Sequence, residues 1–122
     1  MHQYIGGDIP QDLESWPFDN PQSDYQILRG APKASGRLDA GSNDGPWRLG
    51  IWSCTEGAFE CTELGDELQT ILEGRLTLTR SDGEVVDAGP GDSIFTCRGE
   101  RVVWDIHETV TKVFFTSLVA SS

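Results

Sequence analysis

Histidine and cysteine, the side chains most used to bind transition metals, are scarce in this sequence. Its 122 residues include only two histidines, His2 and His107, so one chain cannot supply a site built on three imidazoles. The three cysteines, Cys54, Cys61 and Cys97, are odd in number and have no CxxC spacing. This pattern argues against a disulfide framework or a zinc ribbon. We expect reduced, mostly buried thiols instead.

Basic residues are also few. The chain has 9 Lys and Arg against 20 Asp and Glu, a formal net charge of -11. This excess of acidic residues argues against binding to nucleic acids or anionic membranes, because both require a basic surface on the protein. No apolar run approaches the ~20 residues of a membrane span, and the start, MHQYIGGDIP, lacks the features of a signal peptide. We expect a cytoplasmic protein of one domain, with enough hydrophobic residues (37%) for a core.

What the sequence does have is a series of short strand-like segments separated by Gly, Pro and Asp-Gly turns. Such spacing is typical of an all-β sandwich or barrel. The expected strands are 25–30, 37–40, 47–54, 58–62, 68–72, 75–79, 85–87, 93–96, 101–106 and 109–119.

Residues 1–24 form a separate, irregular N-terminal arm in this interpretation, and 25–122 form the barrel domain. Prolines at positions 10, 17 and 21 interrupt any long helix or central strand there. We expect one helical turn at 11–15. Trp16 and Phe18 would anchor the arm, either on its own barrel or on a second subunit.

The spacing of hydrophobic residues in one segment is compatible with either a helix or a strand. Leu64, Leu68, Ile71 and Leu72 have the spacing of an amphipathic helix. The neighbouring segments read as strands, however, and RLTLT after Gly74 alternates. We therefore predict a hairpin with a β-turn at residues 73–74.

The residues from 57 to 106 resemble the first and second motifs of the cupin superfamily. The first motif is Gly, His-x-His, three or four residues, Glu, six residues, Gly. Glu67 and Gly74 match its second half, while Cys61 and Glu63 stand at the two histidine positions. The resemblance implies a double-stranded β-helix, or jelly roll.

The second cupin motif is Gly, five residues, Pro-x-Gly, two residues, His, three residues, Asn. Gly91 and Gly99 match it, but Cys97, Val102 and Ile106 replace its proline, histidine and asparagine. The turn glycines are present and the polar ligands are not.

Within the superfamily, the chain looks most like small cupins related to ureidoglycine aminohydrolase and the ethanolamine-utilisation cupin. The matching features are a Trp-bearing strand, an LEG triplet, a DG turn, a GPGD turn, a Gly followed five residues later by Trp, and a late Lys. Here these are Trp52, 72–74, 82–83, 89–92, Gly99 with Trp104, and Lys112. This group implies homodimers, which also agrees with the need to cover sheet edges.

The metal site implied by the superfamily is expected to be absent. Cys61, Glu63 and Glu67 could in principle bind zinc or iron. Val102, however, removes the ligand from the opposite strand and leaves a one-sided set. We predict no metal and no other cofactor.

The alternation of side chains along a strand predicts which of the remaining candidate residues point into the barrel. If Val102 points inward, Trp104 and Ile106 do too, and His107 points outward, which favours a surface histidine over a general base. Cys61 lacks a nearby base, so a structural thiol is expected there. For Lys112 we expect a structural ion pair rather than a catalytic role.

The same alternation, started from Glu67, places Gln69 inside the barrel. The predicted ligand-binding set is therefore Cys61, Glu63, Glu67, Gln69 and Trp104, a few polar groups beside an aromatic wall. The first functional hypothesis is a metal-free protein that binds a small polar or cationic metabolite. The alternative is a small-metabolite enzyme, such as an aminohydrolase, isomerase or epimerase, with Glu63 or Glu67 as general acid–base.

Overall fold

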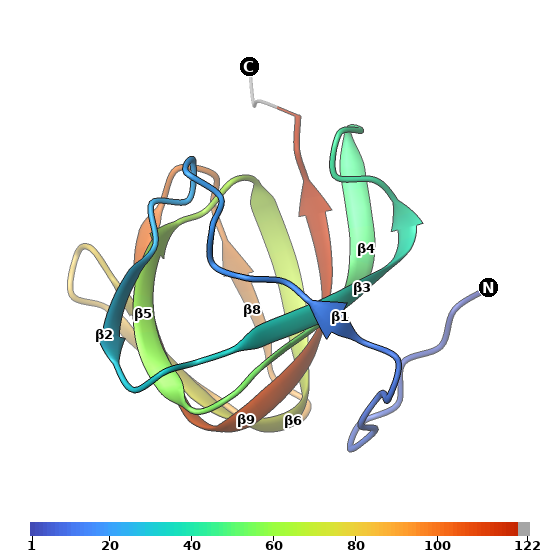
Figure 1. Ribbon diagram of the computed structural model, residues 1–122, viewed down its shortest axis with the longest axis horizontal. Helices are drawn as coiled ribbons and strands as arrows, with labels where there is room; N and C mark the ends of the chain where they lie inside the picture. Colours follow the sequence, from blue (N-terminus) through green and yellow to red (C-terminus); the bar gives the residue numbers. More distant parts are fainter. Residues whose placement is uncertain (120–122) are drawn as a thin grey trace.

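The computed structural model describes residues 1–119 and contains nine strands (Figure 1). In chain order they are β1 (Glu14–Ser15), β2 (Gln26–Arg29), β3 (Ala34–Gly41), β4 (Trp47–Cys54), β5 (Gly57–Thr62), β6 (Asp66–Arg80), β7 (Val85–Ala88), β8 (Ser93–Thr96) and β9 (Arg101–Ser117). All pairings are antiparallel, and the sheet curls into a barrel of the jelly-roll type. The predicted all-β jelly-roll barrel is confirmed.

Two long strands, β6 and β9, form the frame of the barrel. The first half of β9 pairs with β5, its second half pairs with β4, and β6 runs alongside both halves. The two strands curve together along the lower part of the barrel in Figure 1. Because each strand bends and continues, both contribute side chains to both sides of the interior.

The continuity of these strands corrects two sequence predictions. Segments 68–72 and 75–79 belong to one strand, and so do 101–106 and 109–117. Gly74 is not in a hairpin turn but at a bulge, where the register between β6 and β9 shifts. Its φ is +89°, and a Cβ at this position would lie 2.2 Å from the backbone oxygen of Thr109. Glycine here permits the bend rather than a chain reversal.

The N-terminal arm packs on the barrel of its own chain. Residues 14–15 form β1 on β3 instead of the expected helical turn. The ring of Trp16 contacts Phe114 at a centroid distance of 6.2 Å, and Phe18 lies 4.6 Å from Phe59. We call residues 16–25 the strap, since this segment crosses in front of the barrel interior between β1 and β2 (Figure 1).

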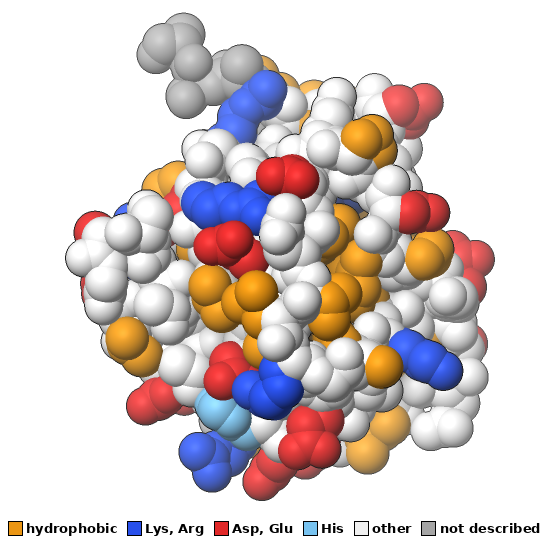
Figure 2. Space-filling model, turned by 60° about the vertical axis from the view of Figure 1, so that its left-hand side comes forward, with side chains coloured by type: hydrophobic (Ala, Val, Ile, Leu, Met, Phe, Trp, Pro, Cys, Tyr) orange, Lys and Arg blue, Asp and Glu red, His pale blue; other side chains and the backbone are white. Residues whose placement is uncertain are grey.

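The core lies inside the barrel and follows strand alternation. Val102, Trp104 and Ile106 are all buried, as the parity of β9 predicts. On the outside, hydrophobic side chains gather in the middle of one face and charged side chains surround them (Figure 2). No helix among residues 1–119 has the length and apolar character needed to cross a membrane.

Candidate functional site

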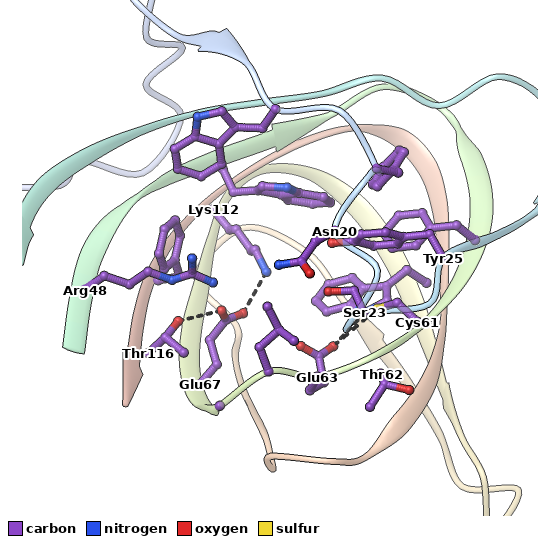
Figure 3. A pocket seen from close by; sticks show the side chains of 18 of the residues that line it. Asn20, Ser23, Tyr25, Arg48, Cys61, Thr62, Glu63, Glu67, Lys112 and Thr116 are labelled. Atoms are coloured by element: carbon purple, nitrogen blue, oxygen red, sulfur yellow. Dashed lines mark hydrogen bonds and ion pairs between the residues drawn. The ribbon is translucent and has the colours of Figure 1, made fainter. Parts of the chain in front are cut away.

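A cavity of about 170 Å³ opens between the barrel interior and the strap. Its walls come from β4, β5, β6 and β9, and from residues of the strap. The aromatic lining residues include Trp52, Phe59, Trp104 and Phe114, and the charged ones are Arg48, Glu63, Glu67 and Lys112. Figure 3 shows polar side chains from both the strap and the strands pointing into this space.

Lys112 lines the cavity and points into it (Figure 3). Its Nζ lies 3.0 Å from Glu67 Oε2 and also donates to Gln69 Oε1. The same ammonium lies 4.3 Å from the ring centroid of Trp104 and 4.7 Å from that of Trp52. A cation over two indole faces is stabilised by both π systems. Only 6% of its side chain is exposed, so the protein replaces its hydration shell with fixed partners.

The partners of Lys112 are themselves held in place. Thr116 Oγ1 donates to Glu67 Oε1 at 2.8 Å, and Gln69 Nε2 donates to Thr96 Oγ1 at 3.2 Å. These side chains meet because they point inward from adjacent strands, with Glu67 opposite Thr116 in the β6–β9 register. Both oxygens of Glu67 are therefore engaged by protein donors.

Glu63 stands just after β5 and faces the same cavity. Its Oε1 accepts a hydrogen bond of 3.0 Å from Trp104 Nε1, and the Cys61 thiol lies 3.9 Å from the same oxygen. Burial raises the pKa of Glu63 to about 7, and the negative charge of Glu67 adds to the rise. Lys112 and the Trp104 hydrogen bond oppose that shift. Glu63 is thus a carboxyl group that can exchange a proton near neutral pH.

The cysteines do not form a nucleophilic centre. Burial raises the pKa of the Cys61 thiol, and Glu63 raises it further. Burial also raises the pKa of Cys54 to about 12. Cys61 and Cys54 are buried, as expected, whereas Cys97 is exposed and departs from that expectation. A neutral thiol is a poor nucleophile, so Cys61 contributes surface to the cavity wall.

His107 lies outside the cavity. Its Nε2 shares a hydrogen bond of 2.7 Å with Thr77 Oγ1, and its Nδ1 lies 3.8 Å from Asp105 Oδ1. This placement agrees with the outward direction predicted from the alternation along β9.

The donor set does not fit a cupin metal ion. Val102 pairs directly with Cys61 across β5 and β9, so an apolar side chain stands where the opposite ligand would be needed. Glu67, the one motif carboxylate present, is already paired with an ammonium group. Within residues 1–119, no group of three or more His, Cys, Asp or Glu side chains is arranged to hold a metal. Lys112 supplies the positive charge at this position.

Four of the five residues proposed from the sequence line the cavity, namely Cys61, Glu63, Glu67 and Trp104. Gln69 does not line the cavity; it is buried, and its side chain accepts a hydrogen bond from Lys112. Whether the set binds a ligand stays a prediction.

Sequence reasoning missed the central position of Lys112 and the contributions of Arg48 and the strap. A signal for Lys112 was present, because a lone lysine in the apolar run VTKVFF is unusual for a strand. Arg48 had a weaker one, since it shares the parity of Trp52. The strap carried none, because its path depends on tertiary packing.

Comparison with known proteins shows which family shares this architecture. Residues 41–114 match the family described as the EutQ-like cupin domain. No curated protein matches the chain in sequence.

Solved structures share the fold. The EutQ protein of Clostridium difficile is 20% identical, with a TM-score of 0.63 over 71% of this chain and 69% of that one. A protein of unknown function from Rhizobium leguminosarum is 29% identical, with a TM-score of 0.60 over 69% and 80%. A DUF861 family protein from Pseudomonas syringae has a TM-score of 0.69 at 20% identity, over 86% of this chain and 44% of that one.

The family match covers more than half of the sequence, including all of β6, most of β9, and the residues Glu67, Gln69 and Lys112. The chain belongs to the EutQ-like cupin domain family.

Proposed function

We propose that the barrel cavity binds a small polar metabolite without a metal ion. The observation that carries this proposal is the Lys112 ammonium, fixed in a half-aromatic cavity by Glu67, Gln69 and two indole rings. A preorganised charge beside an apolar wall is typical of small-molecule sites. Such a group can donate to a ligand oxygen without being reordered when the ligand binds.

The size of the cavity restricts the ligand. Its volume is about 170 Å³, and an apolar cavity of ~150 Å³ accommodates benzene. A ligand with roughly six non-hydrogen atoms therefore fits. The fixed ammonium favours a polar ligand over the cationic alternative. The Lys112 ammonium already occupies the position over the two tryptophan rings where a cationic ligand would bind.

The raised pKa of Glu63 supports a second candidate function, catalysis on a small metabolite. A general acid–base works best when its pKa lies near the working pH, and burial brings the pKa of Glu63 to about 7. Glu67 is less suited, since Lys112 and Thr116 engage both of its oxygens. Of the two carboxylates suggested by the sequence, Glu63 is the one we assign to this role.

Two-dimensional ¹⁵N NMR of chelator-treated protein tests the binding proposal, because the indole N–H groups report on location. Glycolate, glycolamide, ethylene glycol and ethylammonium are suitable probes. We expect saturable shifts of the Trp52 and Trp104 indole signals. Trp47 is the internal control, since it stacks on Phe115 and neither of these residues lines the cavity. Shifts that spare Trp52 and Trp104 for every probe would contradict the proposal.

The catalytic candidate has its own assay. Lactate and pyruvate are incubated with the protein in D₂O, and deuterium uptake at carbon is followed by NMR. Uptake that is lost in Glu63→Gln, with the fold intact, would favour the enzyme over the binding protein. Cytoplasmic location and homodimer formation remain predictions from the sequence.

A further inference from the structure

Arg48 has hydrogen-bonding capacity that the protein does not use. It points inward from β4 and lines the cavity, with its Cζ 5.7 Å from the ring centroid of Phe114. Only Nη1 has a protein acceptor, Asn43 Oδ1 at 2.6 Å, and Nε is buried with no acceptor among residues 1–119. Within those residues Arg48 also has no carboxylate within ion-pair distance. A guanidinium offers five N–H donors, so most remain available.

The charges in the cavity leave Arg48 unbalanced. Lys112 and Glu67 neutralise each other at 3.0 Å. Glu63 is the remaining acid, and its pKa near 7 leaves it partly neutral at physiological pH. The lining therefore carries at most one positive charge in excess. A monoanion balances that charge, whereas a dianion such as phosphate would meet repulsion from Glu67 and from ionised Glu63.

The strap supplies a second donor to the cavity. Asn20 lines the cavity, and its Oδ1 is occupied by the backbone N–H of Gln22 at 3.0 Å. The amide nitrogen is consequently the end that remains to face a ligand. In Figure 3 the Asn20 amide, the Arg48 guanidinium and the Lys112 ammonium all point toward the interior. Three donor groups with one net charge form a site for a planar anion.

We propose that the ligand of this cavity is a small monocarboxylate, with its carboxylate bound by Arg48 and Asn20 and its other end toward Lys112 and Glu63. This inference rests on the proposed binding function and narrows it to one chemical class. Glu63 Oε1 accepts from Trp104, which leaves Oε2 as an acceptor for a ligand hydroxyl. A carboxylate with a hydroxyl on the next carbon, such as glycolate, uses both ends of the site.

Isothermal titration calorimetry with glycolate, acetate, glycolamide, ethylammonium and phosphate tests the inference. We expect glycolate to bind most tightly, acetate more weakly, and glycolamide at least tenfold more weakly than glycolate. Arg48→Gln should weaken glycolate binding at least tenfold, because it removes the only unbalanced charge. Arg75→Gln is the matched control, because Arg75 is an exposed arginine on a different strand, β6. The glycolate affinity of this variant should equal that of the wild type.

The outcomes separate the two proposals. If glycolamide or ethylammonium binds in the cavity as tightly as glycolate, the carboxylate inference is wrong while cavity binding stands. The same holds if Arg48→Gln and Arg75→Gln have equal effects, or if phosphate binds best. If no probe binds to the wild type, both proposals fail. Unchanged far-UV circular dichroism and urea midpoint of Arg48→Gln would exclude unfolding as the cause of lost binding, and Arg48→Lys should retain part of the affinity.

Discussion

The ammonium of Lys112 lies 3.0 Å from Glu67 Oε2, inside the barrel and between strands that run side by side. Glu67 is the one carboxylate of the cupin motif that this chain keeps. The positive charge beside this carboxylate belongs to a side chain of the protein. Unlike a bound metal ion, it cannot be lost to solvent. We expect the stability, the protonation and the proposed ligand preference of the cavity to depend on this pair.

Lys112→Met should strongly destabilise the protein. The substitution leaves the Glu67 carboxylate buried without its counter-charge, which typically costs about 3–5 kcal/mol. Urea unfolding followed by tryptophan fluorescence measures the loss. Lys33→Met, at an exposed position, is the control and should change the free energy of unfolding by less than about 0.5 kcal/mol. The double variant Lys112→Met/Glu67→Gln should recover part of the loss, and a single variant as stable as the control would refute the role of the pair.

Glu63 should give stability a distinctive pH dependence. Its pKa is raised from 4.5 to about 7 in the folded protein, so between these values the folded state holds more protons than the unfolded state. The contribution of Glu63 to the free energy of unfolding is therefore present below pH ~4.5 and declines as the pH rises to about 7. Urea midpoints across pH 4–8 should show this decline in the wild type relative to Glu63→Gln. Glu56→Gln, which alters an exposed carboxylate, should keep the decline.

Trp104→Phe should raise the pKa of Glu63 further. The indole N–H donates to Glu63 Oε1 at 3.0 Å, and this hydrogen bond favours the charged carboxylate. Phenylalanine keeps the aromatic wall but cannot donate. ¹³C NMR titration of the glutamate side-chain carboxyl signals measures the change. A pKa of Glu63 that stays the same or falls in Trp104→Phe would show that the hydrogen bond has no such effect.

Gly74→Ala should destabilise the barrel more than the same change at Gly83. Both glycines have φ near +90°, so both substitutions carry the backbone cost of a left-handed residue, about 1–2 kcal/mol. Only at Gly74 would the new Cβ lie 2.2 Å from the Thr109 oxygen, whereas nothing lies within 4 Å at Gly83. Thermal unfolding of the two variants isolates the clash. Equal losses would mean that the bulge can relax at no cost.

The sequence predicted the fold well because its signals are local. Alternation along β9 placed Val102, Trp104 and Ile106 inside, and the turn glycines marked the ends of several strands. The continuity of β6 and β9 was not predicted, because a glycine at a bulge, such as Gly74, cannot be distinguished from a glycine in a turn by sequence alone. Only the register between the two strands distinguishes them.

The candidate site was partly predictable for the same reason. Glu63, Glu67 and Trp104 follow from motif position and strand parity. Lys112 was recognised as an ion-pair residue, but its partner could not be chosen among 20 acidic residues. Arg48 and Asn20 line the same cavity only because the strap packs across the barrel, and no local sequence pattern encodes that long-range packing.

The measurement that tests the central claim most directly is the ¹⁵N NMR titration of chelator-treated protein with glycolate. The account predicts saturable shifts of the Trp104 and Trp52 indole signals, an unchanged Trp47 signal, and the same affinity when Zn²⁺ or Mn²⁺ is supplied to a parallel sample studied by calorimetry. Binding that appears only after a divalent metal is added, or no shift of either cavity indole, would contradict it.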